Sequence, residues 1–199
     1  MAGPNKHAEI LESAVRLFQE KGYHATSMQD IADEVGLQKG SLYHYISGKE
    51  QLLYEIVHGT ISGYTENLRE IASSPGESAR ARLERAVRAH VEAIAANLGM
   101  LTIYLREAHA LTDQQRLEVN ARSDEYYRLF SGLIAEGVRA GEFRRVDNRM
   151  AAFAILGACN WVYRWYRPGG RLRPGEIADR FLEVFLRGLM AGEDPAKDP

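Results

Sequence analysis

The chain has 199 residues, of which 45% are hydrophobic and 26% charged, and its formal net charge is −2. This composition suits a folded protein with a packed core and argues against intrinsic disorder. A charge so close to zero gives no general affinity for polyanions, so nucleic-acid binding would have to come from local features. The single cysteine, Cys159, excludes an internal disulfide and a multi-cysteine metal cage.

Nothing in the sequence indicates a membrane segment or a secretory signal. The longest nearly unbroken apolar run, at 150–159, is too short to span a bilayer. Residues 1–6 lack the hydrophobic stretch of a secretory leader. We therefore expect a cytoplasmic protein with no membrane contact.

The six prolines leave 5–74 and 76–167 free of proline, as long helices require. Apolar residues recur at helical spacing in both stretches, and the alternation typical of half-buried strands is absent. We expect an all-α fold of about nine helices. Start and stop signals place them at about 6–21, 28–36, 39–45, 49–72, 77–97, 99–110, 113–141, 147–166 and 174–191.

The segment 26–45 has the pattern of a helix-turn-helix. Two short helices are joined by Gly36-Leu37-Gln38, and Gly36 is the residue type that ends a helix in the left-handed conformation. Such a turn sets two helices at a steep angle. We expect a helix-turn-helix domain at 1–48, a ligand-binding and dimerisation domain at 49–191, and a frayed tail at 192–199.

The second of these helices presents hydrogen-bonding groups that suit a DNA groove. Lys39 is able to reach guanine O6 and N7, Gly40 permits close backbone approach, and Lys49 is placed for a phosphate. The candidate contacts on this helix are Gln38, Lys39, Gly40, Ser41, Tyr43 and His44. The alternative is a small helical subdomain with an ordinary polar surface.

Local charge weighs against strong phosphate binding. Residues 1–55 carry five Lys or Arg against eight Asp or Glu, a net of −3. This is opposite to the basic footprint usual in DNA-binding domains. We therefore expect weak non-specific affinity and a shallow dependence of binding on salt.

Residues 10–57 closely resemble the DNA-binding domain of the tetracycline-repressor (TetR) family of bacterial regulators. The matching motifs are AVRLF (14–18), KGY (21–23), ATS (25–27), DIA (30–32), VGL (35–37), KGSLYHY (39–45) and KEQLL (49–53). The resemblance implies a repressor released from a palindromic double-stranded operator by a small molecule. It places the DNA-contacting positions on Ser27, Gln29, Gln38, Lys39, Ser41, Tyr43, His44 and Lys49.

A second, weaker resemblance lies near the C-terminus. The segment WVYRWYRPGG at 161–170 is similar to a subset of the family that senses CoA thioesters, including regulators of fatty-acid and steroid-ring breakdown. It implies an acyl-CoA effector. The alternative is a regulator of drug efflux, which responds to a small apolar compound without recognising CoA.

The candidate ligand site draws on three helices that mix aromatic and polar residues. Asn160, Arg164 and Arg167 share one face of an expected continuous helix, and arginines beside stackable rings suit a nucleotide phosphate. The alternatives are plain core for the aromatic residues and pairing of the arginines with Glu176, Asp179 or Glu183 across a dimer surface. The candidate ligand residues are Tyr104, Arg106, Tyr127, Phe130, Asn160, Trp161, Arg164, Trp165 and Arg167.

The helices expected at 147–166 and 174–191 are apolar on more than one face, which is typical of helices that also pack on a partner. A two-fold DNA site needs two recognition helices about 34–36 Å apart, which favours a homodimer. The alternative is two deeply buried helices in a monomer. The candidate interface residues are Phe153, Gly157, Ile177, Phe181, Val184, Phe185 and Gly188.

Two function classes compete with a regulator. An enzyme or metal site is not expected, because His90/Glu92 and Glu107/His109 are spaced i,i+2 and do not share a helical face. Cys159 lies in an apolar run and is expected to be buried rather than nucleophilic. A protein-interaction module would explain the apolar helices but not the polar face at 38–44. No catalytic residue, metal or cofactor is expected.

Overall fold

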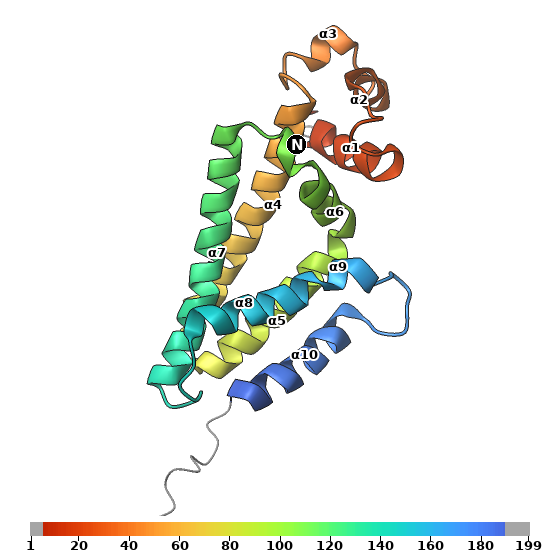
Figure 1. Ribbon diagram of the computed structural model, residues 1–199. Helices are drawn as coiled ribbons and strands as arrows, with labels where there is room; N and C mark the ends of the chain where they lie inside the picture. The colour runs from red at the N-terminus through yellow and green to blue at the C-terminus, as the bar shows by residue number, and fades with distance from the viewer. Residues whose placement is uncertain (1–5, 190–199) are drawn as a thin grey trace, which may run out of the picture. The chain divides into compact units, whose positions relative to one another are not determined.

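The computed structural model describes residues 6–189, and every regular element in that range is helical (Figure 1). The all-α prediction is confirmed. No helix in this range is both long and apolar enough to cross a membrane. The elements are α1 (Lys6–Lys21), α2 (Met28–Glu34), α3 (Lys39–Leu42), α4 (Lys49–Ala72), α5 (Ala79–Ala96), α6 (Leu98–Glu107), the 3-10 helix η1 (Ala108–Ala110), α7 (Asp113–Arg139), α8 (Asn148–Asn160), α9 (Val162–Trp165) and α10 (Pro174–Leu189).

The described helices gather into two compact units. The first unit holds residues 6–62 with 97–122, and the second holds 63–96 with 123–189. The boundary falls inside α4 and α7, so it differs from the expected division at residue 48 because part of α4, α6 and the start of α7 cluster with the N-terminal helices. The expected frayed tail at 192–199 lies outside the described residues.

The first unit is built around a continuous apolar core. α1 packs against α2 and α6, and α2 packs against α3. Gly99 lets α6 approach α1 closely, because a Cβ there would collide with the side chain of Gln19. Fully buried members of this core come from four helices: Ile10, Phe18, Ile31, Leu42, Leu52 and Leu53.

The turn chemistry of the helix-turn-helix matches the prediction. Ser27 caps α2 by accepting a hydrogen bond from the Asp30 backbone at 3.1 Å, and Asp30 accepts one from the Ser27 backbone at 2.8 Å. This is a capping box, with Asp in the place of the usual Glu. Gly36 adopts φ +66°, a left-handed conformation that only glycine reaches without strain.

In the second unit α5 is the central helix, and α8, α9 and α10 all pack against it (Figure 1). Its buried face carries Leu83, Val87, Val91 and Ile94, at the helical spacing expected from the sequence. Arg82 on the same helix donates to the Ala72 carbonyl at 2.6 Å and pairs with Glu136 of α7 at 2.5 Å.

The helix expected at 147–166 is not continuous. α8 ends at Asn160, and the single turn α9 follows, in which the Arg164 amide bonds the Trp161 carbonyl three residues back. Tyr166 is extended, because the helix cannot run into Arg167 when that residue precedes Pro168. The predicted shared face of Asn160, Arg164 and Arg167 is therefore wrong, since Arg167 lies beyond the helix.

Two glycines of α7 give a matched test of this packing. A Cβ on Gly137 would enter the ring of the buried Phe143, whereas a Cβ on Gly132 meets nothing within 4 Å. We expect Gly137→Ala to lower the free energy of unfolding by about 1–3 kcal/mol through overpacking. Gly132→Ala should raise it by about 0.5–1 kcal/mol through helix propensity. Urea denaturation measures both, and equal effects would contradict the packing described.

Candidate nucleic-acid interface and ligand cavity

The face of α3 and the turn after it points away from the first unit's core. Gln38, Lys39 and His44 are exposed, Ser41 is half-buried and Tyr43 is 46% exposed. Within residues 6–189 the side chains of Lys39, Tyr43 and His44 take part in no hydrogen bond or ion pair. Leu42 alone of this helix is buried. The polar face predicted from the sequence thus lies on α3 and the residues that flank it, because the helix ends at Leu42 and not near residue 45 as expected. Its side chains are available to a partner outside the chain.

The other basic side chains of positions 6–55 are tied to the chain itself. Each makes an ion pair or hydrogen bond at ordinary length: Lys6 with Glu9 at 2.9 Å and the Val35 carbonyl at 2.7 Å, Arg16 with Glu34 at 2.6 Å, and Lys21 with Asp30 at 2.6 Å. Lys49 is also engaged, as described next. Among the five basic residues of this segment, only Lys39 has no such partner within the described range.

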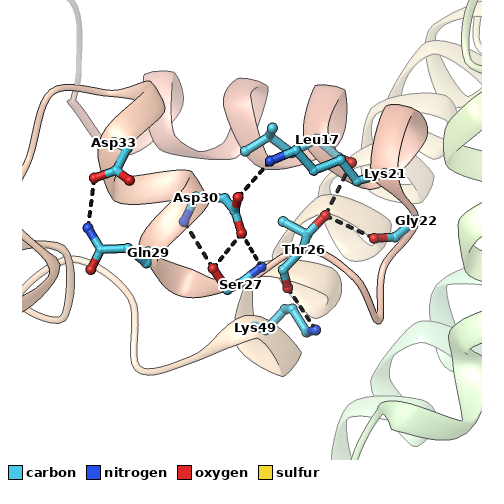
Figure 2. A network of polar contacts seen from close by, with 9 residues as sticks. All are labelled: Leu17, Lys21, Gly22, Thr26, Ser27, Gln29, Asp30, Asp33 and Lys49. Atoms are coloured by element: carbon cyan, nitrogen blue, oxygen red, sulfur yellow. Dashed lines mark hydrogen bonds and ion pairs between the residues drawn. The ribbon is translucent and has the colours of Figure 1, made fainter.

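Lys49 serves as a brace for the turn between α1 and α2. Its ammonium donates to the carbonyls of Tyr23 at 2.8 Å and Thr26 at 2.9 Å, lies 3.4 Å from that of His24, and sits 4.5 Å from the centre of the Tyr23 ring. Figure 2 shows its bond to Thr26, whose hydroxyl in turn donates toward the Gly22 carbonyl at 2.9 Å. The predicted phosphate contact thus has an internal role as well.

Two further predicted DNA contacts have partners in the fold. Ser27 belongs to the capping box, and the Gln29 amide donates to Asp33 at 2.7 Å (Figure 2). The hydrogen bond from Lys21, followed by those from Ser27, holds the pKa of Asp30 well below its usual range. Both Ser27 and Gln29 remain exposed, so their partners do not block them.

Gly40 is exposed on α3, and a Cβ there would meet nothing within 4 Å. Its φ is not in the left-handed region. The fold of the chain itself therefore does not require glycine at this position. What glycine supplies is a bare stretch of helix surface, which suits the close approach of a partner from outside.

The second unit contains a cavity of about 150 Å³ between α4, α5 and α7. Its wall is mostly apolar, with a few polar groups, as small-molecule sites are. The lining residues are Gly63, Tyr64, Asn67, Leu68, Ile71, Ala86, Ala89, His90, Ala93 and Tyr126.

His90 is the buried polar centre of this wall. Its Nδ1 lies 2.8 Å from the Tyr126 hydroxyl, and its Nε2 lies 3.0 Å from Asn160 Oδ1. Because Asn160 Oδ1 accepts, Nε2 carries the hydrogen and Nδ1 accepts from Tyr126. Burial lowers the pKa of His90 to about 4 and raises that of Tyr126, so both groups are neutral at pH 7. The cavity therefore offers neutral polar groups rather than a charge.

The predicted ligand residues whose side chains are described do not line this cavity, and they are dispersed over several helices. Phe130 is fully buried against His90, Asn160 lies behind the same ring, and Tyr127 packs on Phe153 with ring centres 5.0 Å apart. Tyr104 is half-buried beside the core of the first unit. The side chain of Arg106 lies outside the described residues.

The sequence analysis missed Tyr64 and His90 as cavity residues. A signal was present for His90, because it falls on the apolar face of α5 beside Val87 and Val91. A lone titratable group on a buried stripe is a candidate functional residue. The sequence analysis compared His90 only with Glu92 on the same helix. The partners of His90 come instead from α7 and α8.

The arginine and tryptophan segment is exposed. Trp161 and Trp165 are 58% and 44% exposed, and Arg164, Arg167, Arg171 and Arg173 are all exposed. None of these four guanidinium groups makes an ion pair within residues 6–189.

The acids expected as alternative partners of those arginines are engaged elsewhere in the subunit. Asp179 pairs with Arg88, Glu183 pairs with Arg187 at 2.9 Å, and Glu176 accepts from the Arg173 backbone at 2.7 Å. Ion pairs among residues 6–189 therefore do not neutralise the positive charge of the exposed segment.

An exposed apolar surface runs over α8 and α10. Met150, Phe153 and Val184 are 60%, 39% and 68% exposed. Gly157 and Gly188 are also exposed, and Phe181 and Phe185 are half-buried with ring centres 5.8 Å apart. Ile177 differs from this set. It is only 2% exposed, because it faces the subunit's own core, so its side chain is not available to a second copy.

Cys159 is fully buried, as expected, and burial raises the pKa of its thiol to about 12. A thiol held protonated in this way is a poor nucleophile.

Two family models match the chain. Residues 10–56 match the model described as bacterial regulatory proteins, tetR family, and residues 76–189 match the tetracyclin repressor-like C-terminal domain. The HTH-type transcriptional repressor KstR2 of Rhodococcus jostii (strain RHA1) is 36% identical over 186 residues, which cover 92% of this chain and 91% of the relative.

Solved structures agree with these matches. The ketosteroid transcriptional regulator KstR2 of Mycobacterium tuberculosis has a TM-score of 0.82 at 29% identity, with 96% of this chain and 98% of that chain covered. AibR in complex with isovaleryl coenzyme A and operator DNA has a TM-score of 0.79 at 31% identity, with 90% and 97% covered.

The lowered pKa of His90 predicts a pH-dependent stability. Between its ordinary pKa of 6.5 and the folded value of about 4, the unfolded chain binds a proton that the folded chain does not. The contribution of His90 to the free energy of unfolding is therefore fully present above pH 6.5. It is lost as the pH falls toward 4, with a slope of at most about 1 kcal/mol per pH unit. Urea unfolding of wild type and His90→Gln across this range isolates it. His58→Gln, which removes a histidine outside the network, should keep the wild-type slope, and an unchanged slope in His90→Gln would refute the assignment.

Proposed function

Because the chain belongs to the TetR family of bacterial regulatory proteins, we propose that it is a homodimeric transcriptional repressor that binds a palindromic operator through α2 and α3. The observation that carries the proposal is the contrast among its basic residues. Lys6, Arg16, Lys21 and Lys49 serve the fold, whereas Lys39 stands alone on an exposed helix next to a glycine that the fold does not need. It acts in the cytoplasm and has no catalytic role.

The apolar surface of α8 and α10 is the proposed dimer interface. Exposed groups such as Phe153 and Val184 would bury against the same surface of a second copy, and Gly157 and Gly188 would let the helices approach closely. A two-fold interface of this kind gives the two-fold symmetry that a palindrome requires. Phe181 and Phe185 are also part of this proposed interface. Ile177 packs in the core of its own subunit and supports the interface from there.

The proposed effector is a CoA thioester with a short acyl group. The cavity of about 150 Å³ is smaller than the roughly 300–1,000 Å³ of sites that enclose whole drug-sized ligands, so it suits the acyl part alone. The exposed arginines and tryptophans at 161–173 suit the phosphates and adenine of the CoA portion. Support also comes from AibR, whose complex holds isovaleryl coenzyme A together with operator DNA.

A route for the response is present in α4. This helix is continuous from Lys49 to Ala72, and five cavity residues lie on its second half, while Lys49 at its start braces the turn before α2. An effector that displaces the cavity wall would therefore act on the helix that positions the helix-turn-helix. It needs only to bind the non-DNA conformation more tightly, by about 1–3 kcal/mol of coupling.

The two lysines separate DNA binding from folding. We expect Lys39→Met to leave the free energy of unfolding within about 0.5 kcal/mol of wild type. It should weaken operator binding by about 1–3 kcal/mol and relax sequence preference. Lys49→Met should instead destabilise the fold by about 1–3 kcal/mol, because the partly buried carbonyls of Tyr23 and Thr26 lose their donor. Urea denaturation measures the free energy of unfolding, and fluorescence anisotropy with DNA from the region upstream of the protein's own gene measures operator affinity. Unchanged operator affinity and preference in Lys39→Met would overturn the recognition assignment.

A cavity variant and an arginine variant test the effector. Ala93→Leu fills the cavity and should weaken binding of short acyl-CoA by at least about tenfold, as for a blocked apolar subsite, without changing binding of free CoA. Ala96→Leu, on the exposed side of the same helix, is the control. Arg164→Ala with Arg167→Ala should weaken both ligands. Calorimetry that finds no CoA thioester binding, but binding of a small apolar compound, would favour the efflux alternative.

A further inference from the structure

Three side chains of the first unit gather metal-ligand atoms at one point. His24, Glu107 and His109 each offer one ligand atom, and these atoms all lie within 4.8 Å of one another. His24 Nε2 is 2.9 Å from Glu107 Oε2, and the two imidazole rings have centres 6.2 Å apart with planes inclined by 30°. The ligands come from chain segments far apart in sequence, the turn after α1 and the end of α6.

Glu107 and His109 do not lie on one continuous helix, as their exclusion as a pair required. α6 ends at Glu107, and His109 lies in the 3-10 helix η1, so the rule for residues two apart on an α-helix does not apply. Sequence also gave no reason to bring His24 to the same place. Contact between α1 and α6 does this, and Gly99 permits it.

The acid of the cluster is buried more deeply than the imidazoles. The Glu107 side chain is 13% exposed, and its Oε2 is shielded from solvent beside His24 Nε2, which lies 2.9 Å away. His24, in contrast, is 74% exposed. A carboxylate shielded from water is costly unless a positive charge lies beside it.

The backbone that carries His24 is already fixed. Lys49 donates hydrogen bonds to the carbonyls of Tyr23 and Thr26, on either side of His24. The backbone at His24 is therefore already ordered, and metal binding loses little further conformational entropy there. The two exposed imidazoles need only small rotations, because donor atoms around a tetrahedral ion lie about 3.4 Å apart at bond lengths of about 2.1 Å.

We propose that His24, Glu107 and His109 form a binding site for Zn²⁺ or a similar divalent transition-metal ion. Two imidazoles and one carboxylate are borderline donors that suit Zn²⁺, whereas Mg²⁺ and Ca²⁺ prefer oxygen ligands only. Water on the exposed side would complete the coordination. The site ties the turn before α2 to the connection between α6 and α7, and it does not depend on the proposed regulatory function.

Such a link would restrain the first unit. The ion would close a chain segment of more than eighty residues between His24 and Glu107. An ion that binds only the folded chain stabilises it in proportion to the logarithm of its concentration over its dissociation constant. The expected signature is a melting temperature that rises with Zn²⁺ concentration.

The test uses untagged, full-length protein stripped with a chelator and titrated with ZnCl₂ by calorimetry. We expect one Zn²⁺ per chain and a raised melting temperature, with no response to MgCl₂. His24→Gln, Glu107→Gln and His109→Gln should each weaken Zn²⁺ binding by at least about 10- to 100-fold, the loss seen when a supporting residue of a metal site is removed. Each variant is also melted without metal, so that a folding defect is separated from a binding defect.

His7→Gln is the matched control. His7 Nε2 lies 2.8 Å from Glu55, so this variant also removes an imidazole beside a glutamate, but His7 is outside the three-ligand cluster. It should bind Zn²⁺ like wild type. Absence of Zn²⁺ binding to the wild type, or equal affinity in the wild type and the folded His24→Gln and His109→Gln variants, would overturn the proposal.

Discussion

The hydrogen bonds of the Lys49 ammonium are the interaction on which the arrangement of the first unit depends. They satisfy carbonyls of the turn between α1 and α2 and join that turn to the first residue of α4. The capping box of Ser27 begins directly after the braced turn. Because the turn is fixed from both sides, the short helices α2 and α3 have a defined position although neither is long enough to be stable alone.

The pairing of charges within the first unit explains how an N-terminal segment of net negative charge can serve as a DNA-binding surface. Acids that make the segment net negative, such as Glu34 and Asp30, are paired with basic residues behind the exposed helix. The surface at 38–44 carries no acid at all. A DNA groove would therefore contact a small, locally positive face, in which Lys39 forms no ion pair with any residue of 6–189. Affinity built on such a face relies on base contacts more than on phosphate neutralisation.

Much of the fold could be predicted because it depends on local signals. The limits of α1 and α4 follow from their apolar faces and flanking breakers, and Ser27 and Gly36 specify their own caps and turns. The exposed face of α3 could also be predicted, because it depends only on the residues of one short segment and on helical periodicity.

The sites assembled from distant segments could not be predicted in this way. His90 meets Tyr126 and Asn160 only after three helices pack, and His24 meets Glu107 only because α6 lies against α1. Periodicity within one helix carries no information about contacts between side chains of different helices. The expected face of Asn160, Arg164 and Arg167 failed for a local reason, the proline that follows Arg167.

The dependence of specific operator affinity on salt tests the central claim most directly. If Lys39 is the one basic group of this segment left for DNA, a dimer brings about two such positive charges to the duplex, and the logarithm of the binding constant should fall with the logarithm of salt concentration with a slope near about −2. Sequence-specific binding with that slope supports the account. A slope of about −6 or steeper would require basic groups that the fold has already engaged, and would contradict it.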